Sequence, residues 1–145
     1  MAQFRIISIS LLFIAVTVVS LQGQKSDAAL ATIYFYQRSG YGRIAADVYF
    51  GNKPFVQGLR QRSYSVVQCP AGALQLRTSG RPRYFITEKT FLLEVEAKQT
   101  YFIEVVMDYD FLTSSFYLVR RAEADFLGQQ KKLRPHEAPQ PRVVE

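Results

Sequence analysis

The sequence predicts an all-β fold: an antiparallel immunoglobulin-like or prealbumin-like β-sandwich with a short C-terminal helix. The 145 residues include nine Tyr and eleven Phe, and aromatic side chains fit the pleated, half-buried surface of a sheet. Short segments with a two-residue hydrophobic period follow one another along the chain. Turn residues connect these segments, and no helix-length segment lies between them, as in a sandwich or a partly open barrel.

The beginning of the chain is typical of a secretory signal peptide. Arg5 precedes an apolar run from Ile6 to Leu21, and small and polar residues follow it. The run is shorter than the roughly 20 apolar residues that cross a bilayer, but its length leaves an uncleaved anchor as the alternative. We therefore interpret residues 1–28 as a signal peptide or an uncleaved N-terminal membrane anchor. The protein is expected to be extracytoplasmic: periplasmic, secreted or associated with the cell envelope.

Residues 30–122 make up the predicted sandwich domain. The segment "ATIYFYQR" alternates as a first strand does, and the Gly-bearing loop "SGYGRIAA" follows it. The pair Gly51-Asn52 can adopt the positive φ angles of a tight turn, so we expect "ADVYF" and "KPFVQGL" to form a hairpin. Because Pro54 cannot donate a ladder hydrogen bond, it indicates a sheet edge or a bulge.

The second half of this domain has the stronger period. The segments "RSYSVVQ" and "ALQLRTS" are the next strands, and "TFLLEVEA", "TYFIEVVM" and "SSFYLVRR" follow them. The link "AKQ" is short, so the strands on either side of it are expected to pair as antiparallel neighbours. One face of the second of these strands is apolar: Tyr101, Ile103, Val105 and Met107.

The end of the chain combines a helix and a tail. Residues 123–133 are expected to form the C-terminal helix, with Phe126, Leu127 and Leu133 as its apolar stripe. Residues 134–145 contain three prolines and no apolar period. We interpret them as a disordered tail.

Charge and cysteine content exclude several classes of protein. The formal charge is +6, and the basic residues are scattered along the chain. Since they form no dense tract, we expect no nucleic-acid partner. Cys69 is the only cysteine, so no intramolecular disulfide can form, and we expect a buried thiol.

Few residues have the chemistry that catalysis requires. His136 is the only histidine, and in a disordered tail it would lack the rigid frame of a Ser-His-Asp arrangement or a zinc site. Asp108 and Asp110 lack the further oxygen ligands of a calcium site. We therefore expect no catalytic residue, no cofactor and no metal ligand.

Three glutamates leave one enzymatic alternative: Glu94, Glu96 and Glu104. Two of them could act as a carboxylate pair, as in glycosidases, which would make the protein an envelope hydrolase using surface carboxylates. Their alternation with apolar residues fits more simply the polar face of two adjacent strands, with Arg or Lys across from them. We prefer the second interpretation, in which the protein is not an enzyme.

The most distinctive candidate surface combines tyrosine with arginine. Tyrosine has a large apolar body and a polar tip, and both residue types are enriched at binding hot spots. If the first strand turns its tyrosines outward, they form a ligand-binding strip beside the Gly-bearing loop; if it turns them inward, they belong to the core. The residues of this candidate binding surface are Tyr34, Tyr36, Tyr41, Arg43 and Tyr49.

Three segments resemble a bacterial exported family catalogued as domain of unknown function 2846: "ATIYFYQRSGYGRIAADVYFGNKPFVQGLRQRSYSVVQCPAG", "ALQLRTS" and "LEVEAKQTYFIEV". The resemblance extends from about Ala31 to Met107, and Lys98 departs from it because a turn Gly is expected at that position. The order of hairpin, strand, Pro-Gly turn and strand is also similar to PEGA-type and carboxypeptidase-regulatory-like β-sandwiches. The resemblance implies an extracytoplasmic location and brings no catalytic residue.

These observations together predict a non-enzymatic, exported module of the bacterial envelope, with a binding or structural role. Its expected partner is another envelope protein, peptidoglycan or another glycan, or the membrane surface. Surface tyrosine and arginine would carry the binding.

Overall fold

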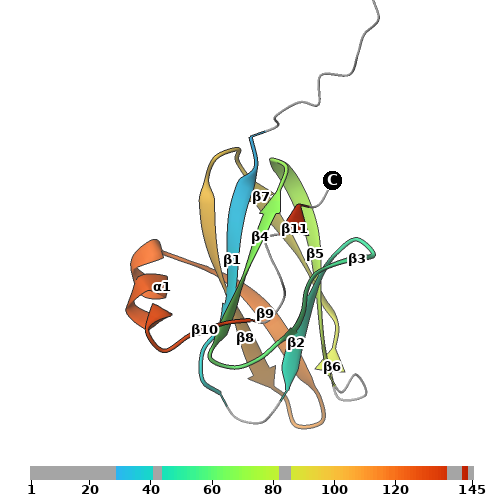
Figure 1. Ribbon diagram of the computed structural model, residues 1–145. Coiled ribbons are helices and arrows are strands. Elements are labelled where there is room, and N and C mark those ends of the chain that lie inside the picture. Colours follow the sequence, from blue (N-terminus) through green and yellow to red (C-terminus); the bar gives the residue numbers. More distant parts are fainter. Residues whose placement is uncertain (1–28, 41–43, 82–85, 137–141, 144–145) are drawn as a thin grey trace, which may run out of the picture.

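Over the residues that the structure describes, the protein is a β-sandwich with one short helix, which confirms the predicted fold class (Figure 1). The computed structural model describes residues 29–40, 44–81, 86–136 and 142–143. The first sheet has the order β10 (Arg134–Pro135), β4 (Ser63–Cys69), β1 (Ala31–Gln37), β8 (Thr100–Tyr109), β9 (Ser114–Arg121) and β6 (Ile86–Thr87), and β11 (Arg142–Val143) also pairs with β4. The second sheet has the order β3 (Lys53–Leu59), β2 (Ala45–Phe50), β5 (Gly72–Arg81) and β7 (Lys89–Val95).

The core lies between the two sheets and follows the predicted alternation. Ile33 and Phe35 of β1 are fully buried, as is Leu76 of β5 in the opposite sheet. The predicted apolar face of β8 points into this core. Cys69 is buried as expected, and burial raises the pKa of its thiol above 9.0.

The predicted hairpin around Gly51-Asn52 is confirmed. Strands β2 and β3 pair as antiparallel neighbours, and Gly51 has a φ of 56°, where a residue without a Cβ is favoured. Pro54 lies in β3, which is the edge strand of the second sheet and shows irregular register against β2. This agrees with the prediction of an edge or a bulge.

The predicted pairing across the link "AKQ" is wrong. Strand β7 pairs with β5 in the second sheet, whereas β8 pairs in parallel with β1 and antiparallel with β9 in the first. The link therefore crosses between the sheets, and the backbone N–H of Lys98 donates to the carbonyl of Leu30 at 3.0 Å. Alternation could not reveal this crossing, because a strand shows the same period in either sheet.

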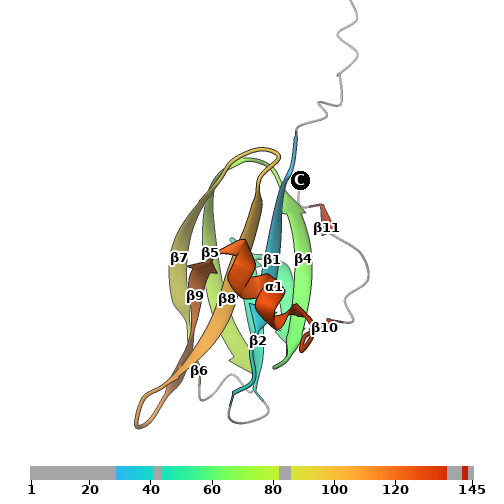
Figure 2. The same ribbon diagram turned by 90° about the vertical axis from the view of Figure 1, so that its left-hand side faces the viewer.

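Helix α1 (Glu123–Gln130) lies on the outer face of the first sheet, over β1 and β8 (Figure 2). It ends three residues before the predicted boundary, and the predicted stripe is partly wrong. Phe126 is 2% exposed and Leu133, in the following turn, is 9% exposed, but Leu127 is 51% exposed because only one side of the helix touches the sheet. Within the described ranges no helix has the length and apolar character to cross a membrane, and residues 1–28 lie outside those ranges.

The C-terminal segment differs from the predicted disordered tail of residues 134–145. Strands β10 and β11 both pair in parallel with β4. The N–H of Arg134 donates to the carbonyl of Arg62 at 2.8 Å, and the N–H of His136 to that of Tyr64 at 2.7 Å. The prolines do not prevent this pairing, since proline is tolerated in an edge strand. Residues 137–141 and 144–145 lie outside the described residues.

Candidate binding site beside helix α1

The predicted tyrosine surface is not a single exposed strip. Tyr34 and Tyr36 point away from the sandwich core, but α1 covers them: Tyr36 is fully buried and Tyr34 is half-buried. Tyr49 is also buried and lies in the second sheet, with the guanidinium of Arg77 over its ring at 4.7 Å. The two remaining residues of the predicted surface, Tyr41 and Arg43, lie outside the described residues.

Aromatic rings fill the space between α1 and the first sheet. The ring of Phe126 lies 5.0 Å from that of Phe102, 5.1 Å from Tyr34 and 5.3 Å from Tyr36. The Tyr64 ring completes the cluster at 5.9 Å. These contacts form a second hydrophobic core that positions the helix on the sheet.

Glu104 is buried on this outer face, at the end of the aromatic cluster. Its carboxylate lies 3.0 Å from Nε of Arg38 and accepts a hydrogen bond from Nε of Arg121 at 2.7 Å. That bond and the attraction of the carboxylate raise the pKa of Arg121. The expectation that a glutamate pairs with arginine across strands is confirmed here, but Glu94 lies in the other sheet and Glu96 in the link, so the three glutamates do not share one face.

Beside the helix lies a hollow of about 790 Å³, bounded by α1, the start of β8, the end of β9 and the link after β7. Its inner side is formed by the rings of Tyr34, Phe102 and Phe126. Its rim is polar and comes from Lys98, Gln99, Thr100, Arg120, Glu123 and Gln130. Tyr34 belongs to the predicted tyrosine surface and lines this hollow; the other lining residues were not predicted, although Lys98 stands where a turn glycine was expected.

Arg120 stands where this hollow meets two others, of about 490 and 460 Å³. Its guanidinium lies 4.8 Å from the centre of the Tyr101 ring, a cation–π arrangement. The Tyr101 hydroxyl accepts a hydrogen bond from the N–H of Glu96 at 2.8 Å, which fixes the ring. Within the part of the chain that the structure describes, Arg120 forms no ion pair. Its charge is therefore available to a ligand.

Lys98 reaches the same hollow from a strained backbone. Its φ is 62°, in the left-handed region that costs a non-glycine residue roughly 1 kcal/mol. Arg62, with a φ of 56°, is the other such non-glycine position in the described chain, and it lies away from this hollow. Strain that persists beside a cavity is a reason to look for a function of the side chain.

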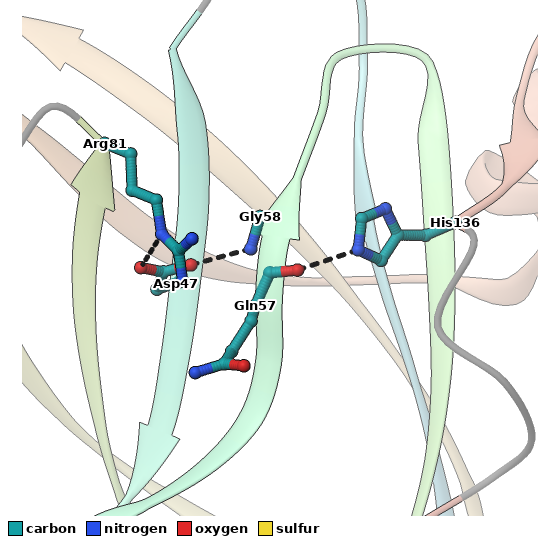
Figure 3. Close-up of polar contacts among 5 residues, drawn as sticks. All are labelled: Asp47, Gln57, Gly58, Arg81 and His136. Atoms are coloured by element: carbon teal, nitrogen blue, oxygen red, sulfur yellow. Dashed lines mark hydrogen bonds and ion pairs between the residues drawn. The ribbon is translucent and has the colours of Figure 1, made fainter.

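A second polar cluster connects His136 to the second sheet (Figure 3). The buried carboxylate of Asp47 accepts hydrogen bonds from the N–H of Gly58 at 2.6 Å and from Nε of Arg81 at 3.0 Å. The carbonyl of the same peptide group, that of Gln57, lies 2.8 Å from Nε2 of His136. Since a carbonyl can only accept, Nε2 carries the proton. His136 is thus held against a peptide group, and among the described residues no carboxylate contacts its ring.

Comparison with known proteins adds no relative to this picture. No protein-family model matches the chain, and no curated protein or solved structure shows significant similarity to it. The resemblance to domain of unknown function 2846 and to PEGA-type modules therefore stays a prediction. Any proposal about function depends on the geometry of the site itself.

Proposed function

We propose that the protein is a non-enzymatic, exported module of the bacterial envelope that binds an acidic glycan, such as peptidoglycan, in the hollow beside α1. The observation that carries the proposal is Arg120, which lies on Tyr101 at the junction of three hollows and has no acidic partner among the described residues. An arginine fork matches a carboxylate, and an amphipathic aromatic ring suits a ligand with both apolar and polar parts.

The rim of the hollow supports a glycan more than an apolar ligand. Gln99, Thr100 and Gln130 offer amide and hydroxyl groups that can bind sugar hydroxyls. Lys98 adds a second cation on the same rim. A glycine would adopt the same positive φ without strain, so the fold itself does not require lysine at this position. Together these groups suit a ligand with many hydroxyls and a few negative charges.

The alternative of an envelope hydrolase rests on one observation. Glu94 and Glu96 both line the hollow of about 490 Å³, together with Tyr101 and Arg120. Both glutamates are exposed, whereas a catalytic acid works best where burial raises its pKa. Release of soluble fragments from purified cell-wall sacculi by the protein, abolished in Glu94→Gln or Glu96→Gln, would support this alternative against ours.

The test of binding uses sedimentation with purified peptidoglycan sacculi at physiological salt, where long-range attraction between a basic protein and an acidic polymer is screened. We expect the protein to sediment with sacculi and Arg120→Gln to bind at least tenfold more weakly, because a hydrogen bond to a charged group contributes about 1.5–3 kcal/mol. Lys98→Gly should weaken binding as well, yet raise the free energy of unfolding by about 1 kcal/mol, because it removes the left-handed lysine.

The matched control is Arg62→Gly. This variant also replaces a positively charged residue that has a positive φ, so it should stabilise the fold by a similar amount. Sedimentation with sacculi should stay unchanged, because Arg62 lies away from the hollow. A protein that does not sediment with sacculi, or one whose binding falls equally in Arg62→Gly and Lys98→Gly, would contradict the proposal. In the second case the attraction would come from net charge alone.

A further inference from the structure

The connection between β8 and β9 exposes large apolar side chains at its tip. Phe111 is 95% exposed and Leu112 is 79% exposed, and Tyr109 beside them is 51% exposed. We call these three residues the β8–β9 tip. Neither Phe111 nor Leu112 belongs to a hydrophobic core, so neither adds to the stability of the fold through burial.

Phe111 and Leu112 lie in the middle of the short connection between β8, which ends at Tyr109, and β9, which begins at Ser114. The N–H of Asp110 donates to the carbonyl of Thr113 at 2.8 Å, and the Asp110 carboxylate accepts from the N–H of Phe111 at 2.7 Å. Phe111 and Leu112 lie between Asp110 and Thr113, and neither has a positive φ, so the backbone here does not require Gly, Asn or Asp. Two large apolar side chains that are exposed side by side and gain no packing indicate a contact made outside the chain.

The β8–β9 tip and the hollow lie at opposite ends of β8. The strand begins at Thr100, which lines the hollow, and ends at Tyr109. Ten residues of strand extend over roughly 30 Å. Because β1 and β8 are parallel, Leu30 at the start of the described sandwich also lies at the end away from the tip. A ligand in the hollow and a surface at the tip could be bound together.

We infer that the β8–β9 tip inserts into the interfacial region of a lipid bilayer with electrically neutral headgroups. The tip offers two or three apolar side chains on a convex turn, too little for a protein interface, which buries about 800 Å² on each partner. A bilayer accepts a small convex apolar element: Phe and Leu side chains enter the boundary between headgroups and acyl chains, and Tyr is favoured at the interface. The carboxylates of Asp108 and Asp110 flank the tip and would lie at headgroup level, which disfavours an anionic surface.

This inference goes beyond the proposed glycan site and uses other residues, so each can fail without the other. The chain contains no Trp, and Phe111→Trp therefore places a single fluorescent reporter at the tip. The matched control is Leu92→Trp on β7, an apolar residue that is 70% exposed and lies outside the tip. The protein purified after export is mixed with phosphatidylcholine vesicles in about 0.5 M salt, where attraction between surface charges is strongly screened.

We expect the emission of Phe111→Trp to shift to shorter wavelength with vesicles and to be quenched by lipids brominated in their acyl chains, while Leu92→Trp changes in neither respect. In otherwise wild-type protein, Phe111→Ser with Leu112→Ser should lower vesicle binding about 100-fold, as expected when two large apolar side chains lose their burial. Leu92→Ser should not lower it, and neither variant should change the melting temperature.

Two results would overturn the inference. One is an unchanged Phe111→Trp spectrum at saturating lipid, including the case in which the reporter responds only to a protein of the envelope. The other is equal quenching of Phe111→Trp and Leu92→Trp, which would mean that the protein adsorbs without a preferred orientation.

Discussion

Phe126 is expected to hold α1 on the sandwich almost alone, and the variant Phe126→Ala tests this. It is the one buried residue of α1, 2% exposed, and its ring lies within 6 Å of four other aromatic rings, those of Tyr34, Tyr36, Tyr64 and Phe102. Replacing a buried Phe by Ala costs about 3–5 kcal/mol. The value here should lie near the lower limit, about 3 kcal/mol, because an eight-residue helix at the surface can detach before the sandwich unfolds.

The assay is urea unfolding together with hydrogen exchange. The matched control is Leu127→Ala, one position along the same helix and 51% exposed, which should change the free energy of unfolding by less than about 0.5 kcal/mol. In Phe126→Ala, amide exchange should accelerate in residues 123–133 far more than in β1. Equal stability of the two variants, or equal acceleration in α1 and β1, would refute the reasoning that one aromatic contact positions the helix.

Three further predictions concern buried polar groups. Asp47→Ala should lower the free energy of unfolding by about 3 kcal/mol in chemical denaturation, because it leaves the N–H of Gly58 without its acceptor. Arg81→Ala should cost less, because the Arg81 side chain is 55% exposed and water can take its place beside the carboxylate. Glu104→Gln should cost about 1–2 kcal/mol by the same measurement, as one carboxylate serves two guanidinium groups. Burial raises the pKa of Tyr36 above 10.0, against the opposing effect of Arg38, and burial also raises the pKa of Cys69 above 9.0. Both groups are therefore neutral in the folded protein, and their contribution to the free energy of unfolding is complete below pH 9.0. This contribution is lost as the pH rises through the two folded-state pKa values. Thermal unfolding between pH 8 and 11 should show this loss, and Tyr36→Phe combined with Cys69→Ala should flatten it.

Hydrophobic alternation was enough to predict the core but not the assignment of strands to sheets. Ile33, Ile103 and Val105 point inward as their period predicts. The same period would be seen whether β7 joined β8 or β5, because alternation records which face is buried and not which neighbour is paired. The prolines of the C-terminal segment were misleading for a related reason: an edge strand accepts proline, and only the tertiary structure shows that an edge is near.

Most residues of the candidate site could not be predicted from the sequence, because the pairing register of the strands brings them together. Arg120 lies opposite Ile103 in the pairing of β8 with β9, and this brings it to the Tyr101 ring. The two-residue period of "SSFYLVRR" places Arg120 and Arg121 on opposite faces of β9, but nothing in that segment shows that Arg121 is paired with Glu104. Lys98 was different, since its departure from an expected turn glycine was visible in the sequence and corresponds to a positive φ.

The pairing of β10 and β11 with β4 also covers one outer edge of the first sheet. An unpaired outer strand presents a row of N–H and C=O groups that can template the addition of a strand from another molecule. The C-terminal segment occupies that position on β4, while β3 at the edge of the other sheet carries Pro54 and irregular register. A chain truncated after Leu133 would keep both hydrophobic cores but leave β4 uncovered, so we expect it to fold and then to form strand-exchanged dimers or fibrils at concentrations where the intact protein stays monodisperse.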